Sequence, residues 1–414
     1  MSVKVTLLIP TYNRPKYLER TLHFLKVQKT SIPIIVADGS NTDNAARNRE
    51  LCKDYGDDVD YFHVPWQADS AGVLNNYCER YLKAVNQVKT AYVATCADDD
   101  LPIISSTLRC VEFLDKQPEF VACHGAYLGF RYVPRGILID ELHYSGPSID
   151  GREAGGRLMQ LHARYESLYY AVFRTGTQRA IINEAMQLTP VNFIEIHHST
   201  LAVLTGKIKR LDEIYYFRNL SVKPHSREYE GWYEWLAKDF DQFFSYYRNH
   251  RKRVVDYALS LPNASLDAVA YNHALDMAFI LYVGRGFSLP YWIDHYLAQA
   301  IIDEEERRSI RRWLERCLMP DQRHDVGFNI RTAVKNLIQL FFGEKGIKMA
   351  RKLRAMVAGA PVEAASIQFL NGQSRVSVAA SVKAHFPKAQ WDALLPNLVS
   401  LAEFHEQQHD SSLG

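Results

Sequence analysis

The chain of 414 residues contains no uncharged apolar run of about 18 residues, the length that a membrane-spanning helix needs. Its N-terminus has no basic segment followed by a long apolar stretch, so we expect no secretory signal peptide. None of the six cysteines forms a CxxC pair or shows metal-ligand spacing, which favours reduced thiols in a cytoplasmic protein. If the protein meets a membrane, we expect it to lie on the inner face.

Two nucleotide-binding signatures and any strong charge bias are also missing. No GxGxxG motif follows the first expected strand, and GxxxxGK[ST] occurs nowhere, which disfavours dinucleotide dehydrogenases and P-loop NTPases. The 49 Lys and Arg residues nearly balance 47 Asp and Glu residues, for a net charge of +2. This balance gives no reason to expect a nucleic-acid partner.

Short apolar runs alternate with amphipathic segments over the first hundred residues. Leu18, Leu22 and Leu25 have the spacing of one helix face, Asn13 suits the cap of that helix, and Pro15 suits its first turn. Alternating strands and helices predict a mainly parallel sheet covered on both faces. The expected strands are residues 3–10, 33–37, 60–64 and 91–95, and a Gly- and Pro-rich stretch over 131–155 is expected to be a loop.

Three consecutive carboxylates, Asp98, Asp99 and Asp100, follow the fourth expected strand. Adjacent carboxylates repel one another unless a cation lies among them. Mg²⁺ and Mn²⁺ prefer such oxygen ligands and commonly take water and substrate phosphates as the remainder. We therefore favour a metal–diphosphate site over a solvated acidic turn.

Polar turns follow three of the expected strands, at residues 11–14, 38–40 and 98–100. In parallel α/β sheets, ligands bind beyond the carboxyl ends of the strands. The coincidence of three such turns supports a ligand site at this edge more than any single turn does.

The second half of the chain has a different pattern. From about residue 226, large aromatic and apolar residues recur at helical spacing, which predicts an all-α domain. We expect a catalytic domain at 1–225, with a nucleotide-binding half at 1–105 and an acceptor half at 106–225. A helical domain would follow at 226–358, and a linker with a last helical segment at 359–414.

The first 225 or so residues resemble the family 2 glycosyltransferases of the GT-A fold. The resemblance rests on an ordered set of segments: VTLLIPTYNRPKYLERTL, IIVADGS, CADDDLP, FIEIHHSTLAVLTGKIKRL and YYFRN. Family members often read Leu-Asp-x-Asp-Asp where this chain has Ala97 in place of the first aspartate. Which carboxylate of the acidic run takes which role therefore stays open.

The resemblance implies a GT-A catalytic domain with a Rossmann-like sheet, which transfers a sugar from a nucleotide-sugar to an acceptor hydroxyl with inversion. UDP is the family's commonest nucleotide, and Mn²⁺ or Mg²⁺ its commonest cofactor. By position, Asp38 would contact the base and Asp98 the ribose. Asp99 or Asp100 would hold the metal, with His225 as a further ligand. The remaining residues of the nucleotide pocket would be Pro10, Thr11, Tyr12 and Arg14.

An inverting transferase needs a base for the acceptor hydroxyl, and the resemblance points to Glu195. The family's usual Glu-Asp reads Glu195-Ile196 here. A carboxylate favoured by the start of a helix is the competing explanation. His197 and His198 are weighed as metal or acceptor ligands against the commoner role of core histidines.

The resemblance implies a glycan, glycolipid or protein as acceptor. The helical domain would serve acceptor recognition, formation of a homo-oligomer or peripheral membrane contact, the last through basic runs at 307–312 and 345–354. An inactive relative that binds glycan or nucleotide-sugar as a scaffold is the main alternative, because Ala97 and Ile196 depart from the family pattern. A sugar-nucleotide pyrophosphorylase is the second, although its Gly-rich loop is missing.

Overall fold

The computed structural model divides the chain into two compact units, Met1–Val283 with Gln368–Gly414, and Gly284–Ile367. Nearly all described residues belong to the first unit. The structure describes residues 4–29, 32–65, 73–133, 136–185, 187, 191–221, 240–262, 264–286, 367–369 and 375–410.

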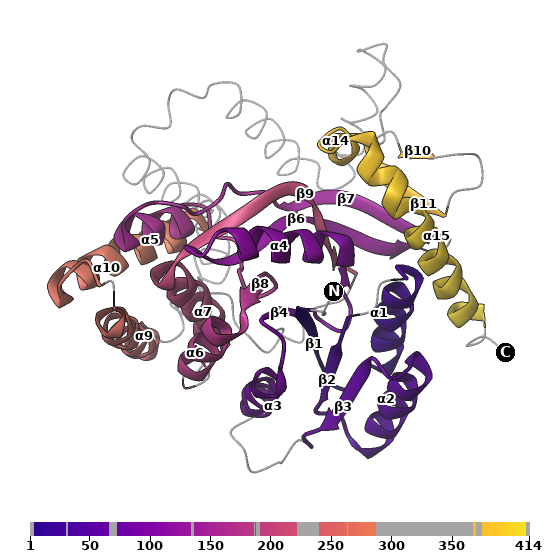
Figure 1. Ribbon diagram of the computed structural model, residues 1–414, viewed down its shortest axis with the longest axis horizontal. Helices are drawn as coiled ribbons and strands as arrows, with labels where there is room; N and C mark the ends of the chain where they lie inside the picture. Colours follow the sequence, from indigo (N-terminus) through magenta and orange to yellow (C-terminus); the bar gives the residue numbers. More distant parts are fainter. Residues whose placement is uncertain are drawn as a thin grey trace, which may run out of the picture. The chain divides into compact units, whose positions relative to one another are not determined.

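Parallel strands and covering helices form the N-terminal part of the chain, as predicted. The strand order is β3-β2-β1-β4, and each neighbouring pair is parallel. Helices α1 and α2 lie on one side of these strands and α3 on the other (Figure 1). The elements are β1 (Val5–Thr11), α1 (Pro15–Val27), β2 (Ile34–Asp38), α2 (Thr42–Tyr55), β3 (Val59–His63), α3 (Val73–Gln87) and β4 (Tyr92–Thr95).

Alternation along β1 explains why both faces are covered. Leu7 packs in the cluster that holds the apolar face of α1, whereas Leu8 packs with α3. Pro15 occupies the start of α1 as predicted, but the predicted cap is wrong: Arg14 is the N-cap residue and has no side-chain cap bond. Asn13 has a left-handed φ of 54°, and its side-chain oxygen accepts a hydrogen bond from the backbone N–H of Asn41 at 2.9 Å. Asn13 thus ties the β1 turn to the start of α2.

Residues 101–219 extend the sheet with mixed pairing. The order continues β4-β8-β6-β7 through antiparallel pairs, while β9 runs parallel to β6 and antiparallel to β5. The loop expected over 131–155 is partly wrong, because Ile137 and Ile139 are buried in a strand paired with β6. The elements are β5 (Leu101–Pro102), α4 (Ile104–Lys116), β6 (Phe120–Val133), β7 (Gly136–Tyr144), α5 (Ala154–Ala163), β8 (Val172–Arg174), α6 (Thr175–Ala185), α7 (Val191–Thr205) and β9 (Lys207–Asn219).

The C-terminal segment returns to this sheet. Strand β11 pairs in parallel with β7, and α15 packs on α1. Thus residues 375–410 complete the same unit as the N-terminal strands, whereas residues 284–367 form the second unit. The remaining elements are α9 (Phe240–Ser260), α10 (Ala268–Gly286), β10 (Ile367–Phe369), β11 (Val376–Ala379), α14 (Ala380–Lys383) and α15 (Lys388–Asp410).

Gly136, the first residue of β7, lies against the start of β11 in a conformation that any other residue would adopt only with strain. Its φ is 143°, and a Cβ atom there would collide with the backbone carbonyl oxygen of Arg375, which accepts the Ile137 N–H at 2.7 Å. We expect Gly136→Ala to lower the free energy of unfolding by about 1–3 kcal/mol. Gly156→Ala, in a helix with open space around the glycine, is the matched control and should be neutral or stabilising. Urea unfolding of both variants tests this; equal stabilities would contradict it.

No helix among the residues that the structure describes is long and apolar enough to cross a membrane.

Candidate active site

The acidic run lies in a turn between β4 and β5. Asp100 donates its backbone N–H to the Ala97 carbonyl, which closes the turn, and β5 then pairs with the end of β9. The Thr21 hydroxyl bonds the backbone carbonyls of Asp98 and Asp100 at 2.9 and 3.0 Å. Helix α1, through Thr21, therefore holds the backbone of the acidic turn in place.

Two of the predicted nucleotide-pocket residues contact this turn. The Thr11 hydroxyl donates to Asp98 Oδ2 at 2.7 Å. Arg14 Nη1 lies 3.4 Å from Asp98 Oδ1 and 3.1 Å from Asp99 Oδ2. The structure thus brings the polar end of β1 and the acidic run together, as expected for strand ends at one edge of a sheet.

The three carboxylates have little contact with solvent, and each is affected by the charge of its neighbours. Burial, followed by the charge of Asp99, raises the pKa of Asp98 to about 7, although Arg14 and Thr11 oppose the shift. Burial also raises the pKa of Asp99, against Arg14 and Arg218, and raises that of Asp100 well above its usual range. A bound cation would relieve this repulsion and keep the cluster ionised.

The donor set suits a hard cation that brings its own phosphate ligands. Asp100 Oδ1 accepts the Asn219 N–H at 2.7 Å, and the Asp99 side chain is 13% exposed. Among described residues, no three or more His, Cys, Asp or Glu side chains converge to form a complete protein-only metal site. Mg²⁺ is typically held by one or two carboxylates plus substrate phosphates and water, so Asp99 and Asp100 fit that role.

Asp38 lies at the end of β2 but is enclosed. Its residue has no exposed surface, and its carboxylate accepts from the Ser40 N–H at 2.7 Å, the Asn48 amide at 2.9 Å and the Tyr61 hydroxyl at 2.8 Å. In this arrangement Asp38 holds the 38–40 turn, and contact with a base requires these partners to move. His63 is partly exposed beside that turn, and its Nε2 is bonded to the carbonyl of the buried Ser40 at 2.8 Å.

Glu195 lies in the first turns of α7 and is exposed. Within the described part of the chain its side chain forms no hydrogen bond or ion pair. Burial, with Glu195 as the next cause, raises the pKa values of Tyr144 and Tyr165. Glu195 is therefore within electrostatic range of Tyr144, at the end of β7, and of Tyr165, after α5.

Arg218, near the end of β9, connects this region with the acidic turn. It donates to His143 Nε2 at 3.2 Å and to the Tyr144 hydroxyl at 3.3 Å. Burial alone would lower the pKa of Arg218, but the neighbouring ionisable groups outweigh it and raise the pKa. In order of effect they are Tyr170, Tyr144, Asp100 and Glu195.

The other predicted residues are less informative. Pro10 and Tyr12 are partly exposed beside Thr11, and His225 lies outside the described residues. The sequence interpretation missed Thr21, Tyr144 and Asn219, which support or face the site. Asn219 ends the YYFRN segment, so its strand was visible in the sequence, but its bond to Asp100 depends on the β5–β9 pairing.

His197 and His198 are core residues. Both have no exposed surface, His197 Nδ1 bonds His250 Nδ1 at 3.0 Å, and His198 Nε2 bonds Gln178 Oε1 at 3.1 Å. Burial lowers the pKa of His198 and that of His250 to about 3. They serve packing rather than a metal or acceptor.

This burial predicts an acid-sensitive stability. The folded state keeps His198 neutral down to about pH 3, whereas the unfolded chain binds the proton near pH 6.5, so stability is lost as pH falls below 6.5. We expect the unfolding free energy of His198→Gln to fall less steeply than wild type, by about 1.4 kcal/mol per pH unit between pH 6 and 5. Urea unfolding at pH 8, 6 and 5 measures the difference. Parallel curves for the two proteins would contradict the assignment.

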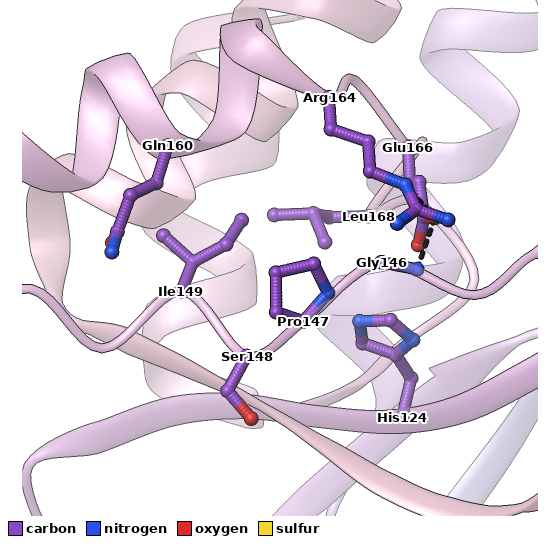
Figure 2. Close-up of a pocket in the computed structure, with 9 residues that line it drawn as sticks. All are labelled: His124, Gly146, Pro147, Ser148, Ile149, Gln160, Arg164, Glu166 and Leu168. Carbon is purple, nitrogen blue, oxygen red and sulfur yellow. Dashed lines mark hydrogen bonds and ion pairs between the residues drawn. The ribbon is translucent and has the colours of Figure 1, made fainter.

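A small cavity lies away from these residues, between β6, α5 and the segment before Ile149 (Figure 2). It has room for about one water molecule. The Glu166 carboxylate there accepts the Ser145 N–H at 2.8 Å and also the Gly146 N–H, so it braces a loop. It shares no residue with the acidic run. Its lining is His124, Gly146, Pro147, Ser148, Ile149, Gln160, Arg164, Glu166 and Leu168.

The chain is similar to one protein family in sequence and to several solved structures in fold. The model of the glycosyl transferase family 2 matches residues 6–176. S. aureus TarS 1–349 in complex with UDP-GlcNAc is 17% identical, with a TM-score of 0.47 over 70% of this chain and 79% of that one. Mannosyltransferase PcManGT from Pyrobaculum calidifontis in complex with GDP-Man and Mn²⁺ is 14% identical, with a TM-score of 0.40 over 81% and 88%. No curated protein sequence matches the chain.

The family match covers β1 to β8, the part of the chain that contains the three polar turns and the acidic run. It agrees with the α/β sheet and with the first three of the five segments from which the resemblance was inferred, whereas the segments that begin at Phe193 and Tyr215 lie beyond the match. Residues 6–176 of the chain are therefore similar to a glycosyl transferase family 2 domain.

Proposed function

We propose that the protein transfers a sugar from a nucleotide-sugar, with UDP as the nucleotide, to an acceptor hydroxyl with inversion at the anomeric carbon. Asp99 and Asp100 would hold Mn²⁺ or Mg²⁺, with His225 as a further ligand. The nucleotide would lie along Pro10, Thr11, Tyr12, Arg14 and Asp98, and Asp38 would meet the base once its partners move.

The observation that carries this proposal is the position of Arg218. Its charge acts on Asp99 and Asp100, while Glu195 acts on Arg218 in turn. Arg218 directly precedes Asn219, whose backbone N–H donates to Asp100 Oδ1 at 2.7 Å, and it donates to the Tyr144 hydroxyl at 3.3 Å. The acidic run and the candidate base are thus both within electrostatic range of one cation. A diphosphate beside the carboxylates and an acceptor beside Glu195 would then meet across Arg218.

Each residue has a chemical task in this arrangement. Glu195 takes the proton of the acceptor hydroxyl as its oxygen attacks the anomeric carbon. Arg218 adds positive charge beside the diphosphate as the bond to the sugar breaks. A divalent ion, when bound, supplies charge that neutralises the leaving diphosphate without proton transfer.

The exposed position of Glu195 suits a large acceptor such as a glycan, glycolipid or protein. Tyr144 and Tyr165 are partly exposed within electrostatic range of it, and such rings offer apolar faces to a sugar. The basic runs considered for membrane contact and most of the segment considered for a homo-oligomer lie outside the described residues.

Release of nucleoside diphosphate tests the proposal. The protein would be incubated with a panel of UDP- and GDP-sugars, with Mn²⁺ or with excess EDTA, and the products followed by ³¹P NMR. We expect slow Mn²⁺-dependent release from one donor, faster when the acceptor is added. The anomeric configuration of the product, read by ¹H NMR, should be opposite to that of the donor.

Other results would point elsewhere. Binding of nucleotide-sugars without any release, over the whole panel, would favour the inactive scaffold. Formation of nucleotide-sugar from sugar 1-phosphate and nucleoside triphosphate would favour a pyrophosphorylase. A product with retained configuration would contradict the role of Glu195.

A further inference from the structure

Arg14 forms ion pairs with two carboxylates of the acidic cluster. Its guanidinium bridges the carboxylates of Asp98 and Asp99, at 3.4 and 3.1 Å, and only 15% of its side chain is exposed. Asp99 is one of the two residues proposed to hold the divalent ion. Arg14 is therefore already a partner of a carboxylate that the divalent ion also needs.

A row of stacked side chains holds Arg14 there. The Arg14 guanidinium lies 5.7 Å from the centroid of the Tyr17 ring, and Arg20 lies 5.5 Å from the same ring. Arg20 also lies 4.8 Å from the Tyr132 ring, and its Nε donates to Gln408 Oε1 of α15 at 2.8 Å. Helices α1 and α15 both contact this row, which keeps the Arg14 guanidinium beside the carboxylates in the absence of another anionic partner.

A guanidinium and a divalent ion on the same carboxylate repel each other across a few ångströms, in a site with little water to screen them. A diphosphate changes this balance, because its oxygens offer a second anionic partner to both cations. Arg14 lies at the N-terminus of α1, where backbone N–H groups also favour an anion. The guanidinium need only turn from the carboxylates towards the diphosphate.

We propose that Arg14 is a resident counter-ion that excludes free divalent metal from the acidic cluster and releases the carboxylates only when a diphosphate arrives to receive it. The metal and the nucleotide would then bind cooperatively, as a unit. This inference rests on the proposed function, because it requires that Asp99 and Asp100 bind the metal of a nucleotide-sugar.

Mn²⁺ binding, measured by the electron paramagnetic resonance signal of free Mn²⁺, tests the inference without any turnover. Wild type, Arg14→Met and Arg14→Lys would be titrated at pH 8 with and without saturating UDP or GDP. In wild type we expect nucleotide to tighten Mn²⁺ binding at least tenfold. In Arg14→Met, Mn²⁺ alone should bind at least tenfold tighter than in wild type, and nucleotide should add less.

Two variants serve as controls for this result. Arg14→Lys keeps the positive charge and should retain weak binding of Mn²⁺ alone. Arg47→Met removes an equal charge from a side chain that is 50% exposed and paired with Glu19, and it should behave as wild type. Thermal unfolding of each variant checks that it is folded.

Failure of the counter-ion role of Arg14 and failure of the proposed function give different results in this experiment. If wild type binds Mn²⁺ tightly with nucleotide but Arg14→Met binds Mn²⁺ alone no better than wild type, the counter-ion role is overturned and the transferase site remains. If Arg47→Met gains as much as Arg14→Met, the effect is one of overall charge, which also overturns it. If wild type binds no Mn²⁺ in the presence of any of the nucleotides, the proposed metal-dependent function itself is contradicted.

Discussion

Asp99→Asn is expected to lower the rate of Mn²⁺-dependent sugar transfer about 10²–10³-fold, the size of effect seen when one group that stabilises developing charge is removed. The substitution keeps the shape of the side chain but removes the charge shared by Arg14 and the proposed metal. The fold should survive, because Thr21 still holds the backbone of the turn through Asp98 and Asp100. Steady-state release of nucleoside diphosphate over a range of Mn²⁺ concentrations measures the loss.

Asp43→Asn is the matched control for this variant. Asp43 is exposed in the first turn of α2, and the same change of charge there leaves the acidic turn untouched. We expect its Mn²⁺ dependence to equal that of wild type. An Asp99→Asn enzyme that kept wild-type transfer at low Mn²⁺ would remove Asp99 from the metal site.

Glu195→Gln is expected to lower the transfer rate about 10²–10⁴-fold, the range that general-base catalysis contributes. The amide cannot accept the proton of the acceptor hydroxyl. Glu195 forms no hydrogen bond or ion pair in the described part of the chain, so folding should be unaffected. The dissociation constant of the donor, measured by calorimetry, should stay within about twofold of wild type while single-turnover transfer collapses.

Glu50→Gln, an exposed glutamate on α2, controls for the loss of a surface charge. It should transfer sugar at the wild-type rate. If Glu195→Gln lost donor affinity and transfer together, the residue would be a donor ligand rather than the base. Full activity in Glu195→Gln would remove it from the reaction.

Local patterns predicted the N-terminal part of the fold well. The apolar runs that became β1, β2 and β4 are short and bounded by polar turns, and the alternation of Leu7 and Leu8 reports the two covered faces. The loop expected over 131–155 shows the limit of this reasoning. Its Gly and Pro content masked Ile137 and Ile139, whose burial depends on strands from distant parts of the chain.

The return of the chain to the sheet was equally hidden. Val376 and Val378 alternate with Ser377, which is a weak signal in four residues, and nothing local indicates that they pair with β7. Helix α15, by contrast, lies within the stretch 359–414 in which a last helical segment was expected, because its apolar spacing is local.

The sequence indicated the residue types of the site but not which side chains enclose them. Asp38 and Gly39 marked a turn, yet the sequence does not tell that Asn48 and Tyr61 close over the carboxylate. The bridge from Arg14 to Asp98 and Asp99 follows from the ends of two neighbouring strands, β1 and β4, sharing one edge, which the alternating pattern implied. The electrostatic influence of both the acidic turn and Glu195 on Arg218 depends on the register of β9 against β5, which only the fold supplies.

A crystal structure of the protein soaked with Mn²⁺ and UDP tests the central claim most directly. The anomalous signal of manganese should lie within coordination distance of Asp99 or Asp100 and of the diphosphate, with the Arg14 guanidinium turned from the carboxylates. UDP bound elsewhere, or bound at this edge of the sheet with no manganese at the acidic turn, would contradict it.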